Sequence, residues 1–228
     1  MLEATGITVR YGGRTALEAA SLTIRPGEVT GLAGPSGCGK STLARVMAMM
    51  LRPDAGTLTV DGVPVTGWRQ RAPRDLRTRV ALIYQQPRLA VDPRLRLAEV
   101  IGEPLAANGR PDGERVAELA ALTGLTGELL TRWPHEVSDG QLQRACVARA
   151  LTLEPRYLVC DEMTTMLDAS TQAHLVAVVN AYRERTGAGV LAISHDPLLL
   201  DRWADGVVDF AGGQGPTPGQ PGRALRST

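Results

Sequence analysis

Apolar and polar residues along this chain follow two periodicities, one typical of strands and one typical of helices. Residues 2–10 and 15–24 alternate partly on either side of Tyr11-Gly12-Gly13, which predicts a β-hairpin. The apolar segment Val29–Ala33 predicts a buried strand, and residues 41–51 predict a helix shortly after it. The first part of the chain is therefore expected to combine an antiparallel β-subdomain with a strand that leads into a helix.

The rest of the chain contains further strand patterns, which are interrupted by one long helical stretch. A second hairpin is expected around Asp61-Gly62, and residues 80–84 predict a buried strand that runs into Gln85. Apolar residues then recur at helical spacing, which predicts an inserted helical subdomain. Afterwards the elements alternate, with strands expected at 157–161, 189–194 and 207–210 and helices at 169–185 and 196–204. This order predicts an α/β fold with a mostly parallel sheet covered by helices.

These patterns divide the chain into one domain and a tail. Residues 1–211 are expected to form the domain, with the α/β core at 1–85 and 156–211 and the helical subdomain at 86–155. Residues 212–228 are rich in glycine and proline and cannot build a core, so a disordered tail is expected there. Because the net charge is only +1, composition gives no reason to expect nucleic acid as a partner.

Membrane insertion and disulfide bonding are not expected. No run of about 18 apolar residues is present, and the first residues lack the apolar core of a signal peptide. Any membrane role is therefore expected to come through a partner. The three cysteines are odd in number and lack metal-ligand spacing, which suits a reducing cytoplasm.

The segment GPSGCGKST, which follows the strand at Val29–Ala33, matches G-x-x-x-x-G-K-[ST]. Its glycines allow backbone N–H groups to turn inward around phosphates, at a helix N-terminus that favours negative charge. Lys40, the single lysine among 25 lysine and arginine residues, is expected to reach the β- and γ-phosphates, and the Ser41 hydroxyl to ligate Mg²⁺. The residues expected to contact the nucleotide are Gly34, Pro35, Ser36, Gly37, Cys38, Gly39, Lys40, Ser41 and Thr42. We therefore expect a RecA-like P-loop NTPase core that binds ATP and Mg²⁺.

Polar residues follow three of the predicted strands. Asp161 and Glu162 end one strand, so Asp161 can hold Mg²⁺ through water and Glu162 can orient or deprotonate the attacking water. Gln85 and His195 end two others. Adjacent acids or a lone histidine are often surface features. At the carboxyl edge of a parallel sheet, beside the phosphate loop, these residues instead indicate a ligand crevice.

Together these motifs resemble the ATP-binding cassette (ABC) ATPases over about residues 2–211. The feature specific to that family is the signature, commonly LSGGQ, which VSDGQ at 137–141 matches. The resemblance implies that Ser138, Gly140 and Gln141 of one chain complete the phosphate site of another, so that a head-to-tail dimer holds two ATP. Ser138 is expected to be the N-cap of the following helix, because Gln141 lies three residues later.

The resemblance also assigns roles to residues outside the signature. It implies that Tyr11 stacks on adenine, although a partly buried tyrosine at a strand end is the alternative. It makes Gln85 the sensor of Mg²⁺ and water, so that Gln85, Ser41 and Asp161 form the metal site. It makes Glu162 the catalytic residue, assisted by Gln85 and His195. The segment TMLD, ending at Asp168, is implied to reach the nucleotide across the dimer.

Two departures from the family pattern stand out. Asp139 replaces the first glycine of the usual signature, and its carboxylate would repel a phosphate ~5 Å away by about 3 kcal/mol at an effective dielectric near 20. The favoured alternative is that Asp139 turns outward and stabilises the first helical turn. Met163 and Met166 replace the proline and small residue usual in the loop after Glu162, which puts the loop geometry in doubt but not the acids.

The segment from Gln86 to Leu105 resembles that of peptide and nickel importer ATPases. The resemblance implies integral membrane permease subunits as partners and a second ATPase chain, identical or different. It implies an extracytoplasmic solute-binding protein as an indirect partner, and a place at the cytoplasmic face of the membrane. The alternatives are a soluble cassette protein acting on nucleic acid or ribosomes and a non-hydrolysing regulatory cassette.

Overall fold

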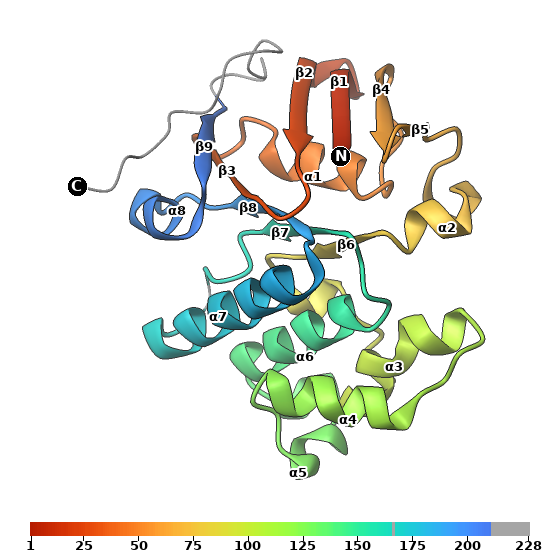
Figure 1. Ribbon diagram of the computed structural model, residues 1–228, viewed down its shortest axis with the longest axis vertical. Helices are drawn as coiled ribbons and strands as arrows, with labels where there is room; N and C mark the ends of the chain where they lie inside the picture. The colour runs from red at the N-terminus through yellow and green to blue at the C-terminus, as the bar shows by residue number, and fades with distance from the viewer. Residues whose placement is uncertain (166, 211–228) are drawn as a thin grey trace.

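The computed structural model describes residues 1–165 and 167–210, which form two β-sheets and the helices packed on them (Figure 1). The tail predicted at 212–228 and the departure at Met166 lie outside the described residues. The first sheet is antiparallel, in the order β2-β1-β4-β5. Its strands are β1 (Leu2–Tyr11), β2 (Arg14–Ile24), β4 (Ala55–Val60) and β5 (Val63–Pro64).

The second sheet is parallel, in the order β6-β7-β8-β3-β9. Its strands are β3 (Val29–Ala33), β6 (Val80–Ile83), β7 (Tyr157–Asp161), β8 (Gly189–Ile193) and β9 (Gly206–Asp209). The predicted α/β fold, with an antiparallel sheet, a parallel sheet and added helices, is confirmed. Both predicted hairpins form, and the second turns through Asp61 and Gly62 at φ of 53° and 78°, the left-handed pair that a tight two-residue turn requires.

The helices follow the sequence pattern closely, except for an unexpected short helix at residues 74–77 and an earlier end to the helix expected at 41–51. They are α1 (Lys40–Met47), α2 (Arg74–Arg77), α3 (Leu97–Ala107), α4 (Gly113–Leu122), α5 (Gly127–Leu130), α6 (Asp139–Leu151), α7 (Ala169–Thr186) and α8 (Pro197–Trp203). The helix expected at 41–51 ends at Met47, because the Arg45 carbonyl accepts the N–H groups of Met50 and Leu51 and Met49 turns to a φ of 58°. Helices α3 to α6 lie between β6 and β7; the subdomain limits at 86 and 155 stay a prediction.

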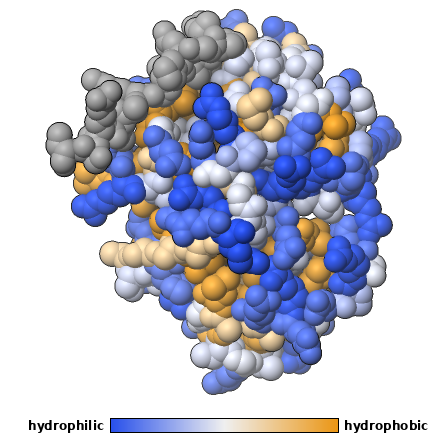
Figure 2. Space-filling model, in the orientation of Figure 1, coloured by the Kyte–Doolittle hydropathy of each residue, from blue (hydrophilic) through white to orange (hydrophobic). Residues whose placement is uncertain are grey.

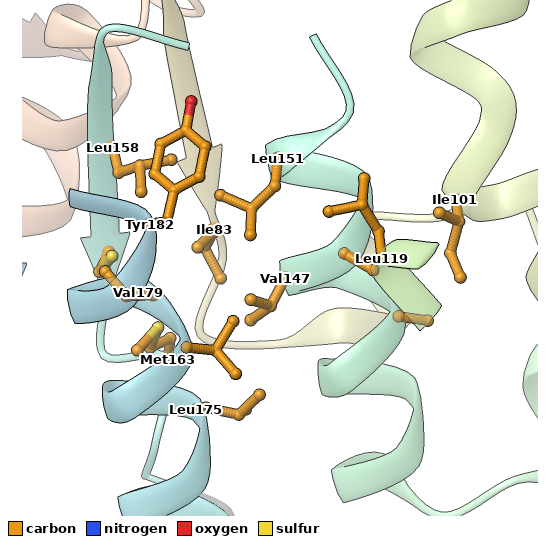
Figure 3. Close-up of a cluster of buried hydrophobic side chains, with 14 of the residues drawn as sticks. Ile83, Ile101, Leu119, Val147, Leu151, Leu158, Met163, Leu175, Val179 and Tyr182 are labelled. Carbon is orange, nitrogen blue, oxygen red and sulfur yellow. The ribbon is translucent and has the colours of Figure 1, made fainter. Parts of the chain in front are cut away.

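The parallel sheet is buried on both faces, which explains its nearly continuous apolar strands. In β7, Leu158 and Cys160 face the core made with α6 and α7, part of which Figure 3 shows. Tyr157 and Val159 of the same strand face the second core, made with α1 and the antiparallel sheet. The strand ends are therefore held from two sides, as a rigid site requires.

The surface seen in Figure 2 is mostly hydrophilic, with smaller hydrophobic patches between polar residues. Among residues 1–165 and 167–210, no helix is long and apolar enough to cross a membrane.

A partly buried polar cluster joins the two sheets at Asp61. Its carboxylate accepts hydrogen bonds from the Tyr157 hydroxyl at 2.6 Å, Arg156 at 2.9 Å and Arg79 at 3.2 Å, and lies 3.4 Å from the amino group of Met1. Burial acts to raise the pKa of Asp61, but Tyr157, Arg156, the amino terminus and Arg79 together outweigh it and hold the pKa below its usual value. The charge on Asp61 therefore favours the folded state.

Replacement of Asp61 by asparagine should lower the free energy of unfolding by about 1–3 kcal/mol at pH 7. Asparagine tolerates the left-handed turn, so the loss reports the charge and not the backbone. Because the folded pKa is depressed, the contribution of Asp61 is present above its unfolded pKa of about 3.9 and is lost as pH falls through the folded pKa. Urea unfolding at pH 7 and pH 3 measures this, with Asp75→Asn, whose side chain is 68% exposed, as the control. An equal loss at both pH values would contradict the charge-based account.

Candidate nucleotide-binding site

Four strands of the parallel sheet end side by side, and a polar residue or the glycine loop follows each one. Gln85 follows β6, Glu162 follows β7, His195 follows β8, and Gly34 follows β3. Because β6, β7, β8 and β3 are neighbours in that order, these residues share one edge of the sheet. The sheet topology alone thus gathers the candidate chemistry beside the phosphate loop.

The loop between β3 and α1 is shaped by glycines that no other residue can replace. Gly34 and Gly39 have φ of 152° and 102°. A Cβ on Gly34 would lie 2.5 Å from the Phe210 carbonyl oxygen, and one on Gly39 would lie 2.5 Å from the Ala16 carbonyl oxygen. The loop is therefore held tightly between the first hairpin and the end of β9, with its backbone preset.

Lys40 lies under this loop as an almost fully buried cation. The residue is 5% exposed, and its ammonium donates to the carbonyl oxygens of Gly34 at 2.7 Å and Pro35 at 2.8 Å. No carboxylate of residues 1–165 or 167–210 pairs with it, and the first turn of α1 has no acidic residue. Its charge and that of the helix N-terminus therefore favour an external anion at this point.

Ser41 and Asp161 meet at the next position along the site. The Ser41 hydroxyl donates to Asp161 Oδ1 at 3.0 Å, and Asp161 is 4% exposed. Burial raises the pKa of Asp161, the hydrogen bond from Ser41 opposes this shift, and the charge of Glu162 adds to it. A hydroxyl and a carboxylate beside a phosphate loop are oxygen donors of the kind that hold Mg²⁺ through one or two protein groups together with substrate phosphates. The residues present thus fit Mg²⁺.

Glu162 is the centre of the polar groups at the strand ends. Its Oε2 accepts from Gln85 Nε2 at 2.7 Å and lies 3.5 Å from His195 Nδ1. Its backbone N–H donates to the Ile193 carbonyl at 3.0 Å, and its φ of 49° turns the side chain out of the strand direction. Glu162 Oε1 receives no hydrogen bond from a side chain of the described residues, so one oxygen is available to water.

The VSDGQ segment forms the N-terminus of α6, as expected. Ser138 is the N-cap; its hydroxyl accepts from the Gln141 N–H at 3.2 Å, and Gln141 Oε1 accepts from the Ser138 N–H at 3.0 Å. Asp139 points to Arg88, whose Nε lies 2.7 Å from its Oδ1. Within the described residues, no hydrogen bond or ion pair joins this segment, including Gly140, to the phosphate loop.

Two other predicted site residues lie at element ends. Tyr11 ends β1 and is 47% exposed; its strand partner is Arg14, close to Ala16, which contacts the phosphate loop. Asp168 is the N-cap of α7 and accepts from the backbone and hydroxyl groups of Ser170 and Thr171, which lowers its pKa. The adenine-stacking and cross-dimer roles of Tyr11 and Asp168 stay predictions.

Sequence reasoning missed the contacts that hold residues 84–90, on both sides of Gln85, against α6. Gln143 Nε2 donates to the Tyr84 carbonyl at 3.1 Å, and Arg149 Nη1 donates to the Ala90 carbonyl at 2.5 Å. Arg88 adds the ion pair with Asp139. These partners are far apart along the chain and follow no short motif, so no sequence signal identifies them.

A glycine loop that joins a parallel strand to a helix, with a buried lysine inside it and a strand-end carboxylate beside it, defines a P-loop nucleotide-binding protein. The sequence pattern of the ABC transporter family matches residues 17–165. The chain belongs to the ABC transporter family.

Three similar proteins refine this picture. A putative peptide import ATP-binding protein of Brucella abortus is 41% identical over 211 residues, which cover 89% of this chain and 63% of that protein. The nickel import ATP-binding protein NikE of Rhodospirillum rubrum is 38% identical over 203 residues, 87% of this chain and 73% of NikE. A solved dimeric ATP-binding cassette bound to ADP and phosphate matches with a TM-score of 0.86, 24% identity and full coverage of both chains, which shows the fold. The chain thus spans less than two thirds of the Brucella relative's length.

Cys38 offers a chemical test of the loop. Its Sγ lies 3.8 Å from Lys40 Nζ, and its side chain is partly exposed. Burial raises the pKa of the thiols of Cys146 and Cys160 to about 12, so they should react slowly. A bulky maleimide is therefore expected to abolish ATP binding through Cys38, and ATP is expected to protect it. Fluorescent-nucleotide titration measures ATP binding before and after the reaction. If ATP binding by Cys38→Ala were still fully sensitive to the maleimide, the placement of Cys38 in the phosphate loop would be wrong.

Proposed function

We propose that this chain is the ATP-binding and ATP-hydrolysing subunit of an importer and works as a head-to-tail dimer that holds two ATP. The observation that carries the proposal is the meeting of Lys40, the Ser41–Asp161 pair and Glu162 at one sheet edge. Binding, metal coordination and water activation each find a residue of the required chemistry there.

Lys40 and the loop backbone bind the triphosphate. An ammonium has three N–H donors, and two of them already hold the carbonyls of Gly34 and Pro35. Among residues 1–165 and 167–210, the third N–H has only the weak acceptor Cys38 Sγ at 3.8 Å, which a phosphate oxygen displaces easily. The ammonium is thus oriented before the nucleotide arrives, and little conformational entropy is lost on binding.

Ser41 and Asp161 would hold Mg²⁺, Ser41 through its hydroxyl and Asp161 through water, with Gln85 beside them. A magnesium ion held there would supply positive charge that offsets the charge developing on the phosphates. Asp161 is kept in place by the Ser41 hydroxyl, and Gln85 by Glu162. Gln85, proposed as the third metal-binding group, is therefore bonded directly to the catalytic carboxylate.

Glu162 orients the attacking water and accepts its proton. Gln85 holds Oε2 at 2.7 Å and His195 lies near the same oxygen, so the carboxylate is fixed while Oε1 faces the water. A fixed carboxylate of this kind provides general base catalysis in line with the γ-phosphate. His195, whose side chain is 54% exposed, is free to follow the phosphate edge.

The second cassette supplies what one chain lacks. The N-terminus of α6 has backbone N–H groups suited to a phosphate, and it makes no bond to its own chain's phosphate loop in the described residues. Ser138, Gly140 and Gln141 of one chain therefore complete the phosphate site of the other. The second chain is either a copy or a different cassette.

The permease subunits bind in an apolar hollow between β6, α3 and α6. The hollow has a volume of about 390 Å³, and its lining includes Met50, Leu82, Leu89 and Pro104. Leu89 is 80% exposed and lies shortly after Gln85, so a partner that covers it gains apolar burial and contacts the segment that leads to the site. The chain then works at the cytoplasmic face of the membrane.

The cargo is a peptide, nickel or a related small solute, delivered to the permease by an extracytoplasmic binding protein. The names of the relatives, one for peptide import and one for nickel import, support this choice. The decisive experiment co-expresses the chain with candidate permeases, purifies the complex in detergent and measures phosphate release. We expect co-purification and stimulation by a loaded binding protein; stimulation by DNA or RNA instead would contradict import.

A further inference from the structure

Arg88 lies in the short 3₁₀ helix Pro87–Leu89 that follows Gln85, and it holds the turn that leads into α6 at three points. Its Nε pairs with Asp139 at 2.7 Å, while Nη1 and Nη2 donate to the carbonyls of Pro134 at 2.9 Å and Val137 at 3.1 Å. All three nitrogens of the guanidinium are therefore used. A lysine could make only a point contact here, since the fork geometry is specific to arginine.

Asp139 on its own would oppose anion binding at the N-terminus of α6. A carboxylate in the first helical turn interacts favourably with the positive end of the helix dipole, and so competes with a phosphate for the same field. Paired with Arg88 at 2.7 Å, the carboxylate has its charge offset by the guanidinium. The pair also joins the segment that carries Gln85 to the helix that begins with the signature.

The pair is not an ordinary stabilising surface contact. The side chains of Arg88 and Asp139 are 46% and 48% exposed, and ion pairs of such exposure contribute little to stability. The two extra carbonyl bonds instead fix the direction of the turn. We propose that Arg88 is a positioning residue, which neutralises Asp139 and sets the geometry of the α6 N-terminus, so that a second cassette can close on ATP. The inference rests on the proposed function.

Two measurements test this role: ATP binding to the single chain and ATP-driven formation of the dimer. In a Glu162→Gln background, Arg88→Ala is expected to leave fluorescent-ATP binding to the phosphate loop within about twofold, while the ATP concentration that drives dimer formation rises about tenfold. Light scattering measures the dimer. Arg88→Ala with Asp139→Asn should recover part of the loss, because no unpaired carboxylate remains while the two carbonyl bonds of Arg88 stay broken. Arg88→Lys should lie between, since it keeps the charge and loses the fork.

The matched control is Arg132→Ala. Arg132 is also 46% exposed and pairs with Glu128 at 2.9 Å, so its loss reproduces the general effect of removing a surface ion pair. The inference is wrong if Arg88→Ala behaves like Arg132→Ala, or if adding Asp139→Asn gives no recovery. Should Arg88→Ala unfold at the assay temperature, Arg88→Gln replaces it, because an amide retains a donor for the turn. A parent protein that binds no ATP would instead overturn the proposed function, and this inference with it.

Discussion

Lys40→Ala is expected to weaken ATP binding by about 100-fold or more and to abolish hydrolysis. Hydrogen bonds to charged groups contribute about 1.5–3 kcal/mol each, and Lys40 is the buried cation of the loop that we propose makes such bonds to the phosphates. The loss has a second origin, because the ammonium also holds the carbonyls of Gly34 and Pro35 and so keeps the loop shaped for an anion. Fluorescent-nucleotide titration and phosphate release measure both effects.

Two variants distinguish these contributions. Lys40→Arg keeps the charge, but Lys40 is only 5% exposed and a planar fork does not fit the same space, so binding should remain poor. Arg52→Ala removes an exposed positive charge just after α1 and should leave binding unchanged. Binding by Lys40→Ala within about fivefold of the unmodified chain would rule out the ammonium as the main phosphate ligand.

The phosphate loop could be predicted because its chemistry is local. Gly34 and Gly39 accept conformations that other residues avoid, and the short spacing to Lys40 places the ammonium under the loop without any distant contact. The residues at the strand ends could be predicted for a different reason. Parallel strands share a carboxyl edge, so Gln85, Glu162 and His195 could be expected together before the strand order was known.

Contacts between distant segments could not be predicted in this way. Arg88 reaches carbonyls 46 and 49 residues further along the chain, and nothing in its neighbours marks it as different from the other arginines. Asp139 pairs with Arg88, a partner set by tertiary packing, and its predicted direction away from a second cassette's phosphate stays a prediction. The end of α1 was missed because apolar residues continue to Leu51, whereas the backbone at Met49 turns left-handed.

Asp168 shows a conflict between a local signal and a family resemblance. Followed by Ala-Ser-Thr, it has the sequence of a helix N-cap, and its carboxylate accepts four hydrogen bonds from Ser170 and Thr171. A cross-dimer role would have to operate on a carboxylate that already stabilises α7. The four hydrogen bonds show that this carboxylate holds the start of α7, and its cross-dimer role stays a prediction.

Glu162→Gln is expected to reduce phosphate release by ~100- to 10,000-fold while ATP binding persists, because only proton acceptance by the carboxylate is lost. Glutamine has the same shape, and its amide oxygen can still accept from Gln85, so the strand-end geometry should survive. Since ATP then binds without turnover, the two-cassette dimer should accumulate and be visible by light scattering. Glu28→Gln, at a residue whose side chain is 48% exposed, controls for loss of one negative charge. Phosphate release within about tenfold of the unmodified chain would show that another group activates the water, and His195, 3.5 Å from Glu162, would then be the first candidate.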